Sequence, residues 1–393
     1  MGYTIKRILL VKETPTGTIP ANPVLMEYLA ESNGLVEEQA TEEVTLFGTD
    51  GDASPMTFGA SSYSGSLGVV LSTDNAPLCL SHALGGYLTA GNATGATWSL
   101  NTIHAVGDMV NHSDGKHTLV CYTAGTTGGT APTLSANPND DRNVRVGDGT
   151  VVWIAMPLLK TATYELSKQM PTFTIEFESE DETGSLYYER YGNVLSSSLP
   201  MAMTGGTISV KMAGDLQGGT LIKSTDATWV EPLSAIAGNK IVPTFKDFYS
   251  YDDCTVKVDN LDLVEVTDVN IDTNRNVSFE DGINNSKIRN IGTATVKGSI
   301  NRVFDKTVMT NYDNHADFKL EFDFKKANGC SLNITYPKVK PAKAKQQHDI
   351  AKLTYLTSEL SAYGTSTVKS VQATATYPAL FDTTGTIVGT GNY

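Results

Sequence analysis

The sequence predicts a mainly β protein in which one fold occurs twice and an extra module interrupts the first copy. Composition is the first observation behind this prediction. Of 393 residues, 40% are apolar and only 18% are charged, and Gly, Thr, Ser, Asn and Asp are plentiful. Such a mixture favours strands and turns over helices. The length is sufficient for two or three domains, each with a core of its own.

A repeated stretch is the second observation. Residues 65–71 read Gly-Ser-Leu-Gly-Val-Val-Leu, and residues 298–304 read Gly-Ser-Ile-Asn-Arg-Val-Phe. Each stretch precedes an Asp-led segment with helical spacing, over residues 74–84 and 305–316. Asp74 is the expected N-cap of the first helix, and Gly85-Gly86 ends it. We therefore predict one short helix in each copy.

Alternating strands come later in each copy, in the same order. Phe173, Ile175 and Phe177 alternate with polar residues, as do residues 318–325, which Asn328-Gly329 turns into a returning strand. Residues 255–258 and 261–263 form a further predicted hairpin, and residues 366–377 a closing strand. The segments predicted to lie outside strands are an extended arm, a connection, a polar loop and a basic run, at residues 1–25, 214–243, 272–291 and 338–345.

A change of composition is the third observation. Residues 86–159 are rich in Gly, Thr and Asn and hold two of the three tryptophans. Surface loops tolerate the insertion of whole domains, so we interpret this stretch as an inserted small β module. The predicted division is residues 1–85 and 160–240 for the first copy, 86–159 for the module and 241–393 for the second copy.

Charge and motifs exclude several function classes. The formal net charge of -14 argues against a protein that grips nucleic acid, because phosphate binding depends on Lys and Arg. The apolar run at residues 8–11 is too short for a signal peptide or a membrane span. There is no Gly-x-Ser-x-Gly, phosphate loop or dinucleotide fingerprint, so we predict neither an enzyme nor a cofactor.

Two stretches partly resemble metal sites, and neither has the full ligand pattern. His112, His117 and Cys121 with His104 could suggest zinc, but their spacing is loose, and a strand from His117 would alternate its side chains. The stretch that begins at Asp272 opens like a calcium loop but lacks the required glycine and the final glutamate. The sequence analysis therefore predicts no metal site.

The order of elements resembles the tail tube protein family of long-tailed bacteriophages. The likeness lies in residues 255–304, the N-terminal arm and the strand at 65–71. It implies a β-sandwich or barrel in each copy, and rings of subunits stacked into a tube through which DNA leaves the capsid. The implied location is the virion tail, assembled in the host cytoplasm, with no membrane. The implied partners are further copies of the chain, the tape measure protein and tail-end proteins.

The duplication suggests how such a ring is built. Rings in this family resemble sixfold arrangements of one tube fold, so a chain with two copies would close a trimeric ring with pseudo-sixfold symmetry. A hexamer of whole chains is the alternative. Carboxylates lining the lumen would repel DNA phosphates. The candidate lumen-facing residues are Glu176, Glu178, Glu321 and Asp323, for which a solvated outer face is the alternative.

The module resembles small carbohydrate-binding modules of chitinases and phage tail proteins. Trp98, Tyr122 and Trp153 carry the likeness, together with residues 124–128 and 148–153. Their rings could stack on sugars of the host surface, or they could form the module's core. The alternative function is therefore a carbohydrate-binding adhesin or decoration protein.

The basic run carries lysines at 338, 340, 343 and 345. Such a run could contact nucleic acid, but it lacks interleaved aromatic residues. It could equally pair with an acidic neighbour across a subunit interface.

Overall fold

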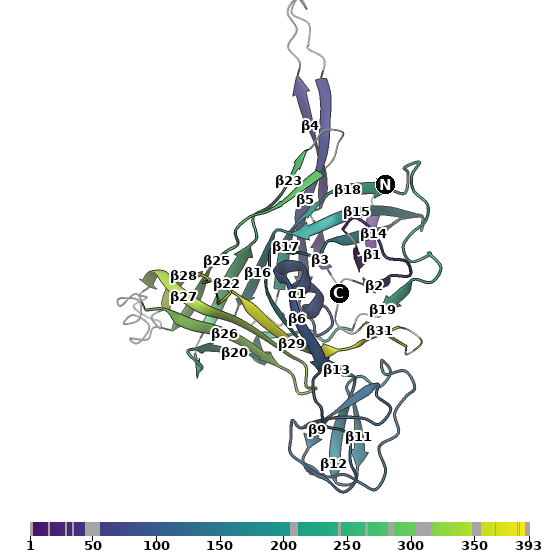
Figure 1. Ribbon diagram of the computed structural model, residues 1–393, viewed down its shortest axis with the longest axis vertical. Coiled ribbons are helices and arrows are strands. Elements are labelled where there is room, and N and C mark those ends of the chain that lie inside the picture. Colours follow the sequence, from purple (N-terminus) through teal and green to yellow (C-terminus); the bar gives the residue numbers. More distant parts are fainter. Residues whose placement is uncertain are drawn as a thin grey trace, which may run out of the picture.

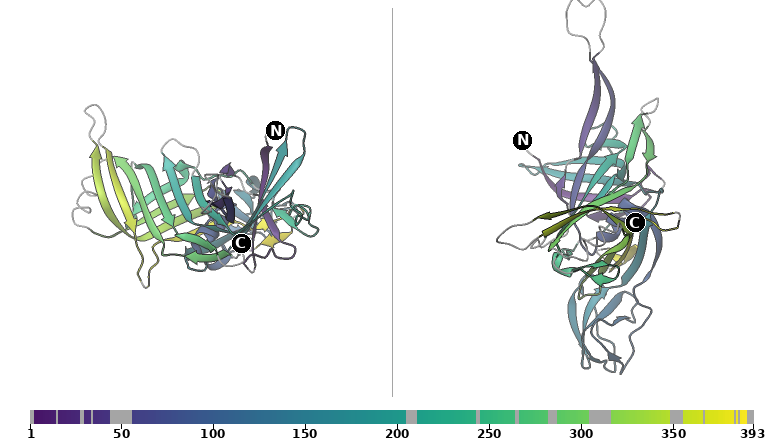
Figure 2. Two further views of the ribbon diagram at one scale, coloured as in Figure 1. Left: turned by 90° about the horizontal axis from the view of Figure 1, so that it is seen from above. Right: turned by 90° about the vertical axis from the view of Figure 1, so that its left-hand side faces the viewer.

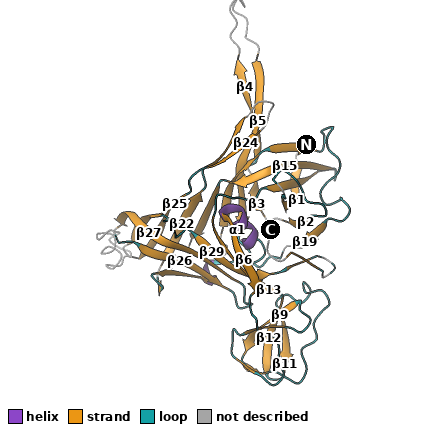
Figure 3. Cartoon of the chain, viewed as in Figure 1, coloured by secondary structure: helices purple, strands orange, loops and turns teal. Residues whose placement is uncertain are grey.

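The computed structural model describes most of the chain. The described residues are 3–14, 16–27, 30–33, 35–43, 56–204, 211–242, 245–263, 266–281, 287–303, 316–347, 355–365, 367–382, 384 and 386–389. Figure 3 shows that this part of the chain is mainly strand and contains one α-helix, which confirms the predicted mainly β class. The predicted second helix, residues 305–316, falls almost wholly outside the described residues.

One antiparallel sheet runs through both halves of the chain, and we call it the long sheet. Its strands in spatial order are β4 (Val36–Glu43), β5 (Met56–Val70), β17 (Lys211–Gly218), β16 (Ser198–Thr204), β22 (Val266–Asn274), β25 (Thr295–Val303), β28 (Tyr355–Ala362) and the second half of β27 (Ser331–Gln347). In Figure 1 it extends from β27 and β28 on the left to β5 at the centre.

Further strands pack on or extend this sheet. In the first half these are β1 (Tyr3–Lys12), β2 (Val24–Glu27), β3 (Ala30–Asn33), β14 (Phe173–Asp181), β15 (Leu186–Ser196), β18 (Thr220–Lys223) and β19 (Lys240–Val242). In the second half they are β20 (Cys254–Val258), β21 (Leu261–Asp262) and β26 (Phe318–Lys325), preceded by the 3-10 turn Tyr251–Asp253. The strands β6 (Gly85–Asn92), β13 (Leu159–Leu166) and β29 (Gln372–Pro378) join the two halves. Two small hairpins complete the host fold, β23 (Val277–Asp281) with β24 (Lys287–Ile291) and β30 (Leu380–Phe381) with β31 (Ile387–Gly389).

The same succession of strand pairs occurs twice. In the first unit, β1 pairs with β14, β14 with β15, β15 and β16 with β17, β17 with β5, and β5 with β3 and β4. In the second unit, β20 pairs with β26, β26 with β27, β27 with β28, β28 with β25, and β25 with β22. Figure 1 shows the first unit at the centre and right and the second at the left.

The pairing registers of the two units agree residue by residue. Gly65 lies opposite Leu216, and Gly298 lies opposite Leu360. Both glycines therefore occupy the same position in their unit, which is what the repeated stretch predicts. At Gly298 a Cβ atom would lie 2.3 Å from the backbone oxygen of Asn270, so only glycine fits between β22 and β25 there.

The helix α1 (Ala76–Leu84) lies against the core of the first unit, and every one of its residues is buried. Its N-cap is Asn75, one residue later than predicted. The side chain of Asn75 makes no hydrogen bond to the first turn of the helix. It accepts one from the backbone N–H of Ser72 at 2.8 Å. The helix ends at Gly85, which has a φ of 78° as a left-handed C-cap requires.

Four segments predicted to lie outside strands are strands. The N-terminal arm contains β1, whose Ile8 and Leu10 enter the main core while Leu9 and Val11 enter a second cluster. A strand buried on both faces reads as a continuous apolar run, which hid its periodicity. The connecting segment holds β17, β18 and β19, the polar loop holds β23 and β24, and the basic run continues β27.

The inserted module has two sheets of its own. Its strands are β7 (Ile103–His104), β8 (Met109–Asn111), β9 (His117–Thr123), β10 (Gly125–Thr126), β11 (Val144–Asp148) and β12 (Val151–Pro157). They form a four-stranded sheet in the order β11-β12-β9-β8 and the pair β7 with β10. Within the described residues no ladder joins these strands to the host fold. Figures 1 and 2 show the module at the lower end of the molecule. Arg142 anchors it to the first unit through a 2.6 Å bond from Nη1 to Oδ1 of Asp74.

Candidate assembly surfaces

One face of the long sheet is polar. On β22, β25 and β28 the side chains alternate between the apolar core and the opposite face, where they are partly or fully exposed. That opposite face, which we call the polar face, carries Asp268, Asn270, Asp272, Asn274, Lys297, Ser299, Asn301, Thr357, Glu359 and Ser361. None of these side chains is aromatic or aliphatic, so the face is suited to lie against water and not against another core.

The polar face is hollowed where β22, β25 and β28 meet. The hollow is lined by Asn270, Asp272, Lys297, Ser299 and Glu359 among others. The left view of Figure 2 shows the strands of this sheet standing side by side in a broad row.

The long sheet also has an internal joint and two open edges. β16 pairs with β17 on one side and with β22 on the other, and this second pairing joins the two units within the chain. In the second unit the corresponding part of β27, residues 340–347, pairs with β28 on one side. Among the described residues no strand pairs with its other side, nor with the outer side of β4.

The two open edges differ in charge. β4 reads Val-Glu-Glu-Gln-Ala-Thr-Glu-Glu, and the open part of β27 holds the lysines at 340, 343 and 345. The sequence alone left open whether the basic run contacts nucleic acid or an acidic neighbour. Its place on a sheet edge, with an acidic edge at the far end of the same sheet, favours the neighbour.

The four predicted lumen-facing carboxylates lie outside the long sheet, on β14 and β26. Glu176 and Glu321 occupy matching positions of the two units, as do Glu178 and Asp323. Each is paired with a cation of its own unit, at 2.6 to 2.9 Å: Glu176 with Arg190, Glu178 with Arg7, Glu321 with Lys319 and Asp323 with Lys257. Their orientation toward a lumen stays a prediction.

The environments of these carboxylates shift two of their pKa values in opposite directions. Burial raises the pKa of Glu176, although Arg190 opposes the shift. Burial also acts to raise the pKa of Asp323, but the hydrogen bonds from Lys257 and Lys325 outweigh it and lower that pKa. Glu176 and Glu178 of the first unit are less exposed to solvent than Glu321 and Asp323 of the second.

The three aromatic residues of the module do not share one exposed platform. Trp153 is fully buried, and the indole N–H groups of Trp98 and Trp153 both donate to Asp148 Oδ2, at 2.7 and 3.1 Å. Tyr122 is 40% exposed, and the guanidinium of Arg145 stacks on its ring at 3.8 Å. In this arrangement Tyr122 is the most exposed of the three, with one face of its ring against Arg145, and sugar stacking by these residues stays a prediction.

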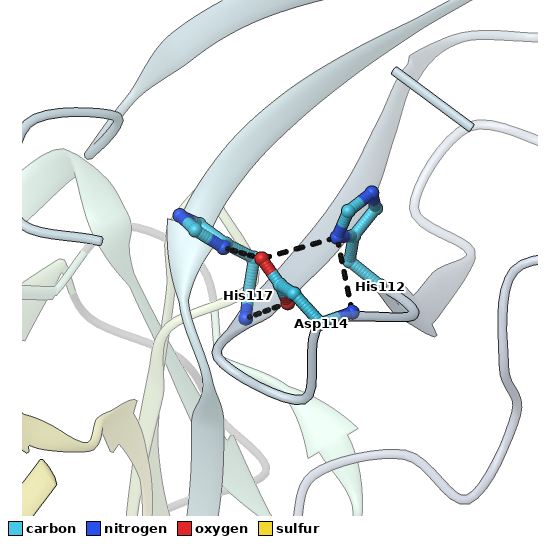
Figure 4. A group of neighbouring side chains, drawn as sticks. All are labelled: His112, Asp114 and His117. Atoms are coloured by element: carbon cyan, nitrogen blue, oxygen red, sulfur yellow. Dashed lines mark hydrogen bonds and ion pairs between the residues drawn. The ribbon is translucent and has the colours of Figure 1, made fainter. Parts of the chain in front are cut away.

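The histidines weighed for zinc separate into two groups. His112 and His117 lie close together around Asp114, as Figure 4 shows. His104 instead packs its ring against Trp153 at 4.9 Å, and Cys121 is buried in the core of the module, where burial raises its pKa. Sequence reasoning overlooked Asp114 because it considered a strand and not the turn that precedes it.

No helix in the described part of the chain combines the length and the apolar character that crossing a bilayer requires.

The comparison with protein families gives a clear result. The model of the family described as phage tail tube protein matches residues 5–376, which is nearly the whole chain. A search of curated proteins found no match. Proteins of this family are structural components of the virion tail that assemble into stacked rings, and the family is not one of enzymes. The chain belongs to the phage tail tube protein family.

Proposed function

We propose that three copies of the chain close into a ring with pseudo-sixfold symmetry, and that stacked rings form the conduit through which DNA leaves the capsid. One observation carries this proposal. The two units are joined inside the chain by β16 and β22, and the strands that correspond to these two are the open edges β27 and β4. Repeating the internal joint between chains pairs β27 of one copy with β4 of the next.

The registers identify the residues of this second joint. Ser196 lies opposite Leu216, which in turn lies opposite Gly65. Pro341 lies opposite Leu360, which lies opposite Gly298. Ser196 and Pro341 therefore occupy matching positions. Just beyond them, Ser198 corresponds to Lys343. On the partner strand, the bulges of β3 and β22 fall at the same place in the ladder, so Glu38 corresponds to Asn274.

The joint inside the chain pairs Ser198 with Asn274. The joint between chains would therefore place Lys343 of one copy opposite Glu38 of the next. Oppositely charged residues facing each other across an antiparallel pair stabilise the sheet, whereas equal charges would destabilise it. Sheet pairing of this kind also removes the two open edges, which otherwise favour aggregation.

Closure of the ring would make the polar face the inner wall of a barrel. The wall would hold small polar side chains and carboxylates at Asp268, Asp272 and Glu359. Its lysines lie beside these carboxylates in the ladder, Lys297 opposite Asp272 and Lys343 opposite Glu359, so we expect DNA phosphates not to be held tightly. The same lumen would hold the tape measure protein before ejection, and tail-end proteins would close the tube in the assembled virion.

The domain division follows the same reasoning. We propose that residues 1–85 and 160–240 form the first tube fold, residues 241–393 the second and residues 86–159 an inserted module. The repeated strand succession and the separate sheets of residues 103–157 support this division, whereas β6 pairs with β13 of the host fold, so residues 85–92 extend the first tube fold.

A thiol crosslink tests the joint, in a background in which Cys254 is replaced by Ser because it is the least buried of the four cysteines. We expect Glu38→Cys with Lys343→Cys to give covalent trimers under mild oxidation. The matched control is Ser198→Cys with Asn274→Cys, which should crosslink within one chain. Electron microscopy of rings in top view then counts the chains. Covalent products only within single chains, or six chains in a ring, would overturn the trimer.

The alternative is a carbohydrate-binding function of the module, which the exposed ring of Tyr122 supports. A glycan array probed with the full chain tests it. A signal that Tyr122→Ala abolishes would establish sugar binding in addition to the tube, and binding that survives the substitution would exclude this site.

A further inference from the structure

We propose that the turn between β8 and β9 binds one divalent transition metal ion, best suited to zinc, through His112, Asp114 and His117. These three side chains place one potential ligand atom each within 4.8 Å of one another. They come from one short turn of the module, as Figure 4 shows, and none of them has a role in the tube assembly proposed above.

The turn itself brings the three residues together. The backbone N–H of His112 donates to the carbonyl oxygen of His117 at 2.9 Å, so the two histidines face each other across the end of the hairpin. Asp114 lies between them, and its Oδ1 accepts hydrogen bonds from the backbone N–H groups of Lys116 and His117 at 2.8 and 3.2 Å. Its Oδ2 is left facing both imidazoles, at 2.6 Å from His117 Nδ1 and 3.2 Å from His112 Nδ1.

The hydrogen-bond partner of His112 indicates that its Nδ1 carries a lone pair. Its Nε2 lies 3.1 Å from the carbonyl oxygen of Pro132, which can only accept a hydrogen bond, so Nε2 carries the proton. In a neutral imidazole Nδ1 is then unprotonated, and the backbone N–H of Asp114 points at it from 3.4 Å. This lone pair also lies 3.2 Å from Asp114 Oδ2, and a cation shared by the two acceptors would stabilise this arrangement.

His117 has an acceptor at each nitrogen. Its side chain is fully buried, with Asp114 Oδ2 beside Nδ1 and Asp141 Oδ2 at 3.3 Å from Nε2. A neutral imidazole has one N–H and can satisfy only one of these carboxylates. A metal ion at the point where the three ligand atoms converge would supply a positive charge beside these carboxylates.

The surroundings favour the metal ion. Two imidazoles and a carboxylate are a common ligand set for zinc, with a water molecule in the fourth position. Imidazoles that bind a metal almost always donate their other N–H to a carboxylate or a backbone carbonyl. Pro132 occupies that place for His112, and the carboxylate of Asp141 lies 3.3 Å from the buried Nε2 of His117 without forming a hydrogen bond. The side chain of Asp114 is 30% exposed, which leaves the site open to water on one side.

The site would hold the module to the host fold. Asp141 precedes Arg142, which binds Asp74 of the first unit, and Asn139 of the same loop donates to the carbonyl oxygen of Phe381 at 3.3 Å. An ion that fixes His117 against Asp141 would therefore order the loop that makes both contacts. Its role would be structural, since nothing in the cluster faces a substrate.

The test uses the untagged full-length chain with cobalt(II) as an optical probe and zinc as competitor. We expect one ion per chain, a visible absorption band typical of low-coordinate cobalt, and loss of both when zinc is added. His112→Asn should weaken binding at least 100-fold, and His117→Gln should abolish it. His104→Gln, a histidine of the same module outside the cluster, is the control and should bind normally.

Two results would overturn the proposal. One is a wild-type chain that binds neither ion at stoichiometric concentration. The other is a His112→Asn variant that binds as tightly as wild type. Because His112 is partly exposed, this variant should fold even if His117→Gln does not, and ring formation seen by electron microscopy verifies that it does.

Discussion

The two units repeat one strand succession but differ in what surrounds it. In the first unit the outer face of β14 and β15 is covered by the segment that contains Trp229 and Leu233. Glu176 on that face has a side chain only 1% exposed, whereas its counterpart Glu321 is 12% exposed. The same position of one fold is therefore a buried ion pair in one unit and a surface pair in the other. The contribution of this ion pair to the stability of the fold therefore depends on the covering segment and not on the strand that carries the glutamate.

The edges of the long sheet differ in the same way. β16 of the first unit is enclosed between two strands of its own chain, and the matching part of β27 has one strand beside it. In a chain with two units, one sheet joint, between β16 and β22, forms within the chain. The strands of the second joint, β27 and β4, are left to pair with other copies. The predictions below test how far the two units remain equivalent.

The largest effect is expected at the glycine that both units share. In Gly298→Val a side chain would collide with the backbone of Asn270 and Ile271, at distances of 2.3 and 2.7 Å from the new Cβ. We expect the free energy of unfolding to fall by about 4 kcal/mol or more, or the chain not to fold. Denaturant unfolding of the monomer measures this. The control is Ser299→Val on the polar face, and equal stability of the two variants would contradict the close approach.

Removal of the buried cation of the first unit should rank second. Arg190→Met leaves the Glu176 carboxylate buried with only the backbone N–H of Leu233 as partner, at 2.9 Å. Breaking a buried pair in this way costs about 3 kcal/mol. Lys319→Met removes the corresponding cation beside Glu321 and should cost less than about 1 kcal/mol, because that pair is partly solvated.

The Arg190→Met deficit should also shrink at low pH, because burial already raises the pKa of Glu176 and loss of the cation raises it further. A protonated Glu176 carries no charge to stabilise. Unfolding of both variants at pH 7 and pH 4 measures the difference. Equal losses in the two units would show that the covering segment has no energetic role.

A pH effect specific to the first unit is expected from His82 in α1. Burial lowers its pKa to about 4 from 6.5, while a hydrogen bond to the backbone of Val194 acts weakly in the opposite direction. The folded chain therefore binds fewer protons at His82 than the unfolded chain, so this contribution to stability is complete above pH 6.5. It is lost as the pH falls toward 4, and amounts to up to about 3 kcal/mol.

The His82→Gln variant carries no titrating group at this position. Its free energy of unfolding should fall less than that of wild type between pH 7 and pH 4, whatever its stability at pH 7. Hydrogen exchange at the two pH values should show the difference mainly in α1 and the strands beside it. Parallel pH profiles of the two proteins would contradict a neutral, buried His82.

The sequence predicted the strands and turns that a local residue pattern specifies. It did not predict the strands whose burial depends on tertiary packing. The strong alternation around Phe322 and the turn at Asn328-Gly329 identified a hairpin, and the repeated Gly-Ser stretch identified matching strands. β1 was missed because both its faces are buried, and β23 and β24 because their residues are mostly polar.

The candidate surfaces were predicted less well for the same reason. Charge and alternation pointed to Glu176 and Asp323, but the polar face lies on other strands, and its side chains are small and unremarkable in sequence. Asp148 belongs to the stretch 148–153 that carries the likeness of the module, yet its bonds to two tryptophans depend on the fold of the module. Only the strand order shows which edge of the sheet is open, so the basic run could not be assigned from its composition.

The smallest effect, and the most specific, is expected at the joint between chains. Glu38→Lys would place a lysine opposite Lys343 of the neighbouring copy, and an unfavourable cross-strand pair costs about 0.5 kcal/mol. A trimeric ring contains three such joints, which together cost about 1.5 kcal/mol. Because the dissociation constant of a trimer scales with the square of the concentration, the concentration at which rings form should rise about fourfold. Mass photometry across a dilution series measures it. Combining Glu38→Lys with Lys343→Glu reverses the pair and should restore assembly, which would show that these two residues meet. If the double variant assembles no better than Glu38→Lys alone, the second joint does not repeat the register of the first, and the units are equivalent in fold but not in assembly.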